Sequence, residues 1–321
     1  MSENIKITML GTTGAGKTCF MVGMYAVMQL GVHGFTLSAQ DMDDDLELTD
    51  NWEQLTEGGE NRFPDSTSKT YNFSFDFSYG FKKLMGFDWL DYRGGALRDK
   101  STQADVQELE ASLVESSCVF LCISGEHLTN KIESPAHALN LAKKTRADRM
   151  NLFLNKLREK RGPIPVVIAI TKFDLCMGRK REDILEDTQK IFNALFTADA
   201  GWLVMICPVS LGKSLASDKV AGSIDPVNLH LPLIFAIYAQ YSKYVAYKKM
   251  EEGEARRVLN QLQGKNRFMR WLNSDVIAKA SSELQKNQAQ ANELQEQMAL
   301  LAQELGRAKV YLNGKEQEIS V

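Results

Sequence analysis

Short runs of apolar and β-branched residues alternate with longer stretches of helical periodicity along the first two thirds of the chain. The six runs span residues 5–10, 71–78, 86–90, 118–124, 165–171 and 204–209. Strands that alternate with helices usually form a mostly parallel sheet with helices on both faces. The connection at residues 79–85 is too short for a helical crossover, so the second and third runs should pair antiparallel. The pattern predicts a three-layer α/β/α fold with six strands, one of them an antiparallel edge strand.

Between residues 31 and 70 the periodicity fades, and the acidic run DMDDDLELTD occupies residues 41–50. Such a long connection is typical of a functional insertion, and an acidic run usually forms a solvated face. We expect a mobile insertion with one short helix here.

The C-terminal part has a heptad pattern of apolar residues. Its a positions are Ile277, Leu284, Ala291, Met298, Leu305, Leu312 and Ile319, and its d positions are Ala280, Asn287, Leu294, Leu301, Ala308 and Lys315. Heptads of this kind favour a coiled coil. We expect a domain at residues 1–265 and a coiled-coil arm at residues 266–321, which would bind a second copy or another protein through residues 277–319. Asn287 and Lys315 weaken the seam, which leaves the alternative of a helix packed back on the domain.

Composition narrows the choice of partners and compartment. With 38 basic and 41 acidic residues the net charge is −3, so we expect no nucleic-acid partner. The five cysteines have no paired spacing and favour reduced thiols. The first ten residues lack an export signal, and polar residues interrupt the apolar stretch at 229–246, which suits a buried helix better than a membrane span. We expect a cytoplasmic protein with no transmembrane segment.

Residues 11–18, GTTGAGKT, match the phosphate-binding pattern G-x-x-x-x-G-K-[ST] and stand between a predicted strand and a predicted helix. The glycines allow successive N–H groups to face a β-phosphate. Lys17 would reach the β- and γ-phosphates, and the Thr18 hydroxyl would bind Mg²⁺. The predicted nucleotide contacts here are Gly11, Thr13, Gly14, Ala15, Gly16, Lys17, Thr18 and Cys19.

Two later segments favour guanine over adenine. Thr171-Lys172-Phe173-Asp174 follows a predicted strand and resembles the [NT]-K-x-D motif of GTPases, in which the carboxylate accepts hydrogen bonds from guanine N1–H and its exocyclic amine. Adenine offers no matching pair of donors, and a site with an unpaired polar group rejects such a ligand. Pro208–Gly212 resembles the serine-containing loop that meets the guanine O6, which adds Ser210 and Leu211 to the predicted contacts.

A further predicted strand ends in Asp91-Tyr-Arg-Gly94, which resembles the D-x-x-G second switch of the same proteins. Asp91 would hold Mg²⁺ through a water, and the Gly94 N–H would contact the γ-phosphate. Four motifs in order across residues 11–211 therefore resemble P-loop GTPases of the Ras-like TRAFAC class. The resemblance implies a G domain that binds GTP or GDP with Mg²⁺ as cofactor.

The first-switch threonine has two candidates, Thr67 and Thr70. We prefer Thr67 as a Mg²⁺ ligand and catalytic residue, because its P-x-x-T spacing from Pro64, together with D-Y-R-G, resembles bacterial double-GTPases. That resemblance implies a place in bacterial conflict or defence systems, an inference at the level of the family alone.

One position departs from the Ras-like pattern. Gly95 stands where those enzymes have a water-orienting Gln, so we expect slow hydrolysis that a partner stimulates. Arg93 is an in-chain candidate for a catalytic charge beside Lys17. We expect a slow GTPase that acts as a nucleotide-controlled switch and signals through its helical arm. The alternative is a scaffold that keeps its nucleotide uncleaved.

Overall fold

The computed structural model describes residues 4–64, 70–92, 97, 102–249, 288–306 and 308–319, with side chains described up to 246 and again from 295. The strands are β1 Ile5–Gly11, β2 Phe35–Ala39, β3 Tyr71–Tyr79, β4 Lys82–Asp91, β5 Cys118–Ser124, β6 Val166–Thr171, β7 Leu203–Pro208, β8 Lys309–Leu312 and β9 Lys315–Gln317. The α-helices are α1 Lys17–Leu30, α2 Met42–Glu57, α3 Gln103–Glu115, α4 Pro135–Thr145, α5 Ala147–Arg161, α6 Arg181–Ile191, α7 Leu231–Lys249 and α11 Gln288–Leu305. Short 3₁₀ helices are η2 Gly125–His127, η3 Phe173–Cys176, η4 Asn193–Leu195 and η5 Lys213–Ala216.

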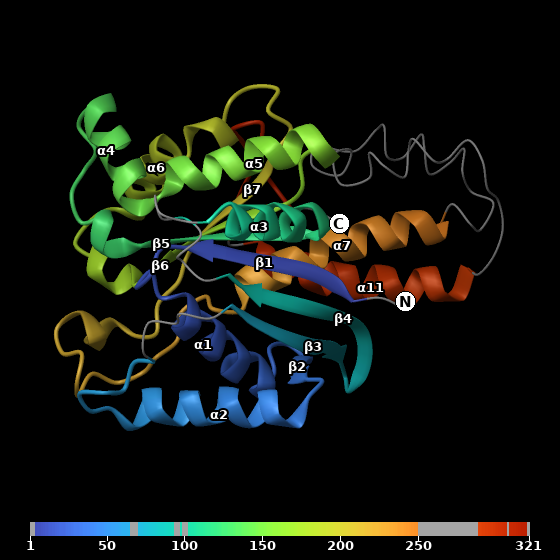
Figure 1. Ribbon diagram of the computed structural model, residues 1–321. Helices are drawn as coiled ribbons and strands as arrows, with labels where there is room; N and C mark the ends of the chain where they lie inside the picture. Colours follow the sequence, from blue (N-terminus) through green and yellow to red (C-terminus); the bar gives the residue numbers. More distant parts are fainter. Residues whose placement is uncertain are drawn as a thin grey trace.

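The nine described strands form one mixed sheet in the order β2-β3-β4-β1-β5-β6-β7-β8-β9 (Figure 1). β4, β1, β5, β6 and β7 are parallel, and β3 pairs antiparallel with β4 as predicted. The expectation of six strands was wrong because β2, β8 and β9 extend the two edges with antiparallel pairs. β3 is therefore not an edge strand. These three strands have five, four and three residues, too few to produce a clear alternation in the sequence.

Helices cover both faces of the sheet, as the alternating pattern predicted (Figure 1). One apolar core lies between the sheet and helices α1, α2, α7 and α11. The other lies between the sheet and helices α3 to α6. All seven residues of β5 are buried, which explains why its sequence reads as an unbroken apolar run.

The insertion at residues 31–70 contains more regular structure than the sequence predicted. β2 comes first, and α2 follows with 16 residues rather than one short helix. The acidic run begins this helix: the Asp41 side chain accepts the Asp43 N–H at 2.8 Å. Three more aspartates in the first turn are favourable beside the positive end of the helix dipole. Buried Leu48 and Leu55 then fix the helix on the core.

Helix α7 occupies the apolar stretch that the sequence assigned to a buried helix. Its residues from Leu233 to Ala239 have no exposed surface, because the sheet and α11 enclose them. No described helix combines the length and the apolar composition that a bilayer crossing needs.

The described part of the C-terminal arm packs on the domain, which was the alternative to a free coiled coil. Met298, Leu301 and Leu305 belong to the same core as α7, and Ser242 Oγ lies 3.3 Å from Met298 Sδ. After Leu305 the chain forms β8 and β9, so the heptad interpretation of Leu312 and Lys315 is wrong. The predicted boundary between residues 265 and 266 lies outside the described residues.

This packing predicts that the arm contributes to the stability of the whole domain. Leu301→Ala should lower the free energy of unfolding by about 2–5 kcal/mol, because the substitution leaves a cavity in a shared core. Urea denaturation followed by circular dichroism measures the change. Leu30→Ala is the matched control, since Leu30 is 91% exposed and its truncation should leave stability within about 0.5 kcal/mol. Equal stability of the Leu301→Ala and wild-type proteins would contradict the packing.

Candidate nucleotide-binding site

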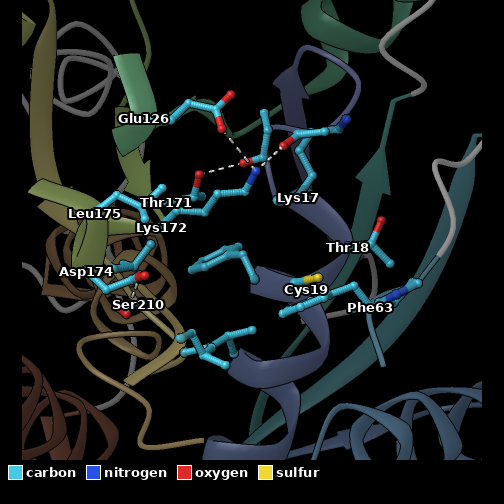
Figure 2. Close-up of a pocket in the computed structure, with 18 of the residues that line it drawn as sticks. Lys17, Thr18, Cys19, Phe63, Glu126, Thr171, Lys172, Asp174, Leu175 and Ser210 are labelled. Carbon is cyan, nitrogen blue, oxygen red and sulfur yellow. Dashed lines mark hydrogen bonds and ion pairs between the residues drawn. The ribbon is translucent and has the colours of Figure 1, made fainter. Parts of the chain in front are cut away.

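The carboxyl ends of β1, β6 and β7 surround a cavity of about 350 Å³. The predicted residues that line it are Thr13, Gly14, Ala15, Gly16, Lys17, Thr18, Cys19, Thr171, Lys172, Asp174, Ser210 and Leu211. Figure 2 shows Lys17 and Cys19 across this space from Lys172 and Asp174, whereas the Thr18 side chain points away from that segment. Residues far apart in the sequence therefore meet at one site, as the motif order predicted.

The loop between β1 and α1 has the conformation that a phosphate-binding loop requires. Gly14 and Gly16 have φ angles of 78° and 79°, a left-handed region that favours glycine. Gly16 is also the N-cap of α1, so the unpaired N–H groups at the start of this helix lie beside the cavity. This helix end could hold an anion.

Lys17, the first residue of α1, and Asp91, the last residue of β4, are buried side by side. The Lys17 Nζ donates to the Gly11 carbonyl at 3.3 Å and lies 3.8 Å from Asp91 Oδ1, beyond hydrogen-bonding distance. Neither oxygen of Asp91 has a hydrogen-bond partner among the described residues. Burial raises the pKa of Asp91 to about 6, although the Lys17 ammonium and the Thr18 hydroxyl oppose the shift.

An orphaned, buried carboxylate beside a hydroxyl suits a hard divalent cation. Asp91 and Thr18 could therefore hold Mg²⁺ together with phosphate oxygens and waters. The described residues contain no cluster of three or more His, Cys, Asp or Glu side chains able to hold a metal. A Mg²⁺ ion at this position would therefore need ligands from the nucleotide, as is usual for this metal.

Thr171 and Lys172 fasten the end of β6 to the phosphate loop. The Thr171 hydroxyl lies 2.5 Å from the Ala15 carbonyl and 3.2 Å from the Ile123 carbonyl. The Lys172 Nζ donates to the Gly14 carbonyl at 2.8 Å, and the backbone of Lys172 is left-handed, with φ of 49°. These contacts hold the two motifs in a fixed relation before any ligand binds.

Asp174 is held from one side by the serine loop. Ser210 Oγ donates to Asp174 Oδ1 at 2.8 Å and accepts the Gly212 N–H at 3.0 Å. Asp174 Oδ2 accepts no hydrogen bond from the described residues, so it can receive a donor from a bound base. The serine loop thus orients the carboxylate as well as lining the cavity.

Several residues of the cavity were missed by the sequence reasoning. They are Phe20, Phe63, Pro64, Glu126, Leu175, Val209, Leu215, Lys219 and Leu229. Glu126 forms an ion pair with Lys172 at 3.6 Å. Most of them come from loops without a motif, although the position of Glu126 directly after the predicted strand at 118–124 was a usable signal.

Some predicted residues lie elsewhere. Gly11 does not line the cavity, but its carbonyl accepts from Lys17, and a Cβ there would lie 3.0 Å from Cys122 Cβ. Thr67, Arg93 and Gly94 lie outside the described residues. Thr70 and Asp91 are described and do not line the cavity.

A family model described as Double-GTPase 2 matches residues 5–201, more than half of the chain. The chain belongs to the Double-GTPase 2 family. This membership confirms the resemblance to double-GTPases and identifies the chain as a GTP-binding P-loop protein. No curated protein matches the sequence.

Solved structures similar to this Double-GTPase 2 protein include three guanine-nucleotide complexes. A GTP-binding protein from Sulfolobus solfataricus with GDP has 14% identity and a TM-score of 0.33, and the match covers 73% of this chain and 51% of that one. A variant of NFeoB from S. thermophilus with GDP·AlF4⁻ has 14% identity and a TM-score of 0.33, and the match covers 93% of this chain and 99% of that one. Roco2 RocCORdC from Methanosarcina barkeri with GDP has 12% identity and a TM-score of 0.32, and the match covers 75% of this chain and 56% of that one.

The raised pKa of Asp91 predicts a pH-dependent loss of stability in the protein without metal or nucleotide. The folded state holds this proton more tightly than the unfolded state, so the contribution is present at low pH and is lost as the pH rises through about 6. Between pH 5 and 7.5 the free energy of unfolding should fall by about 1–2 kcal/mol from this group.

Urea denaturation in EDTA at the two pH values measures this loss. Asp91→Asn should remove it, so the variant gains stability relative to wild type as the pH rises. Asp50→Asn, at an exposed position on α2, is the control and should follow wild type. The prediction would be contradicted if the difference in free energy of unfolding between Asp91→Asn and wild type did not change with pH.

Proposed function

We propose that this protein binds GTP with Mg²⁺, hydrolyses it slowly, and changes state when the γ-phosphate is lost. One observation carries the proposal. A single cavity is lined at one end by Lys17, whose Nζ lies 3.8 Å from the buried carboxylate of Asp91, and at the other by Asp174, which Ser210 holds through one oxygen. The first end suits phosphates and a cation, and the second suits a base with two donors.

At the base end, Asp174 would accept hydrogen bonds from guanine N1–H and the exocyclic amine. Ser210 holds Asp174 Oδ1, so the carboxylate is oriented before the base arrives. Adenine would leave this carboxylate without a donor, and the unpaired polar group would strongly lower the affinity for adenine nucleotides. Lys172 would lie along the base while its ammonium contacts the phosphate loop.

At the phosphate end, the N–H groups of the loop at residues 13–18 would bind the β-phosphate, and Lys17 would neutralise the β- and γ-phosphates. Thr18 and Asp91 would hold Mg²⁺, which would spread the charge that develops on the phosphate oxygens. Three further residues would complete the proposed site. Thr67 would be another Mg²⁺ ligand, the Gly94 N–H would contact the γ-phosphate, and Arg93 would supply a positive charge from within the chain.

We further propose that turnover is slow and increases with a partner. Gly95 follows the D-x-x-G motif and has no side chain to orient the attacking water. A stabilising arginine from a second protein contributes about 10³–10⁵ in rate to such reactions. Arg93 could supply part of this charge within the chain.

Base selectivity provides the direct test of this function. Isothermal titration with Mg²⁺ should give a GDP affinity at least about 100-fold higher than the ADP affinity. Asp174→Asn should abolish that preference and favour xanthosine diphosphate, because an amide N–H can donate to the carbonyl that replaces the guanine amine. Ser210→Ala should weaken GDP binding about tenfold through loss of the bond that orients Asp174. Equal affinities for GDP and ADP in the wild-type protein would overturn the proposal.

The second candidate function is a scaffold that keeps its nucleotide uncleaved, and Gly95 is the observation that favours it. Single-turnover assays with radiolabelled GTP distinguish the two functions. A slow switch should release phosphate with a rate that Lys17→Ala lowers at least about 100-fold. A scaffold would retain intact GTP at every protein concentration, and that result would reject the switch.

A further inference from the structure

The segment that leaves α2 lies against the loop that follows Ser210. The Gly59 N–H donates to the Val220 carbonyl at 3.0 Å, and Gln54 Nε2 donates to the Asn61 carbonyl at 2.6 Å. Residues 58–64 lead toward Thr67, while residues 212–225 follow the serine that holds Asp174. The two segments are separated by about 150 residues in the sequence and meet at one edge of the cavity.

The guanidinium of Arg62 joins them. Arg62 is 1% exposed, although it carries a full charge. Its Nη1 donates to the Gly222 carbonyl at 2.6 Å and lies 3.4 Å from the Val220 carbonyl, and its Nε donates to the Leu55 carbonyl at 2.8 Å. The Nη2 also contacts Leu55 O. Among the described residues Arg62 forms no ion pair; main-chain carbonyls accept its hydrogen bonds, and a Coulombic attraction to Asp218 adds to them.

Both joined segments form walls of the nucleotide cavity. Phe63 and Pro64, the two residues after Arg62, line it from one side, and Leu215 and Lys219 line it from the other loop. The Arg62 guanidinium also lies 5.8 Å from the centre of the Phe63 ring. Arg62 therefore links the two segments that form these walls.

The loop at residues 212–225 is internally rigid, so fixing Gly222 fixes its neighbours. The Asp218 carboxylate accepts the N–H groups of Val220 at 2.8 Å and Ala221 at 2.9 Å. A Cβ at Gly222 would lie 2.3 Å from the Asp218 carbonyl oxygen, which shows how closely the loop is packed on itself. Arg62 thus holds the loop as a unit and not at a single point.

We propose that Arg62 is a positioning residue that slows the release of guanine nucleotide. It does so by holding the segment before Thr67 against the loop after Ser210; we call this link the Arg62 clasp. This inference rests on the proposed function. Arg62 does not line the cavity and acts through Phe63, Pro64, Leu215 and Lys219. The hydrogen bonds of Arg62 to Leu55 and Gly222 involve neither Asp91 nor Thr18, so its effect on release should persist when Mg²⁺ is removed.

The test measures release of a fluorescent GDP analogue from the full chain by stopped flow, with saturating Mg²⁺ and with EDTA. Arg62→Gln should speed release at least about tenfold under both conditions, since it loses charged hydrogen bonds to two segments. Arg62→Lys keeps the positive charge, but an ammonium lacks the planar guanidinium that donates to the Leu55 and Gly222 carbonyls at once. Its GDP release rate should therefore lie between those of wild type and Arg62→Gln. Hydrogen exchange should also rise at residues 213–222 in both variants.

Arg161→Gln is the matched control. Arg161 also donates to two main-chain carbonyls, those of Val114 and Ser116, at 2.7 Å and 2.5 Å, but at the opposite end of the sheet. This control can lower the melting temperature but should leave GDP release unchanged.

The outcomes separate the two hypotheses. The Arg62 clasp would be overturned if Arg62→Lys released GDP at the wild-type rate and showed unchanged hydrogen exchange at residues 213–222. This outcome decides the question even if Arg62→Gln does not fold. Faster release only when Mg²⁺ is present would overturn the clasp too. Failure of the wild-type chain to bind any guanine nucleotide would instead reject the proposed function.

Discussion

The buried pair of Lys17 and Asp91 is the constraint on which the site depends. The parallel neighbours β1 and β4 end at the same edge of the sheet, so the lysine that starts α1 and the carboxylate that ends β4 are buried together. At 3.8 Å they attract each other without a hydrogen bond, and the carboxylate oxygens have no partner among the described residues. Under the proposed function, a phosphate chain would supply partners for the Lys17 ammonium and a cation would supply one for the Asp91 carboxylate.

The incomplete pair requires a rigid surrounding, because a flexible site would relax and solvate the carboxylate. Thr171 provides part of that rigidity by bonding to the Ala15 and Ile123 carbonyls, which ties β6 to the phosphate loop and to β5. The apolar cores on the two faces of the sheet hold these strands in register. The stability of the whole sheet thus keeps the Asp91 carboxylate buried without a hydrogen-bond partner among the described residues.

Local motifs could be predicted from the sequence because their chemistry and their strand–loop–helix context are contiguous. Residues 11–18 and 171–174 are of this kind, and the cavity brings them together. The C-terminal hairpin was missed because a heptad pattern continued through it, although Asn313-Gly314 is a strong turn signal. Arg62 could not be predicted at all. Its partners are main-chain carbonyls, which every residue has, so no residue type in the sequence marks them.

The two ends of the cavity differ in the kind of interaction that holds them, and this difference has a consequence for switching. At the phosphate end, the interactions of Lys17 and Asp91 would depend on how many phosphates are bound. Arg62 donates to main-chain carbonyls and Asp174 accepts from the Ser210 hydroxyl, and these contacts involve neither Lys17 nor Asp91. Under the proposed function, such a protein would keep its hold on the base through a cycle of hydrolysis. The segments near Asp91 would respond to the phosphate, and the base end would set how long the product remains bound.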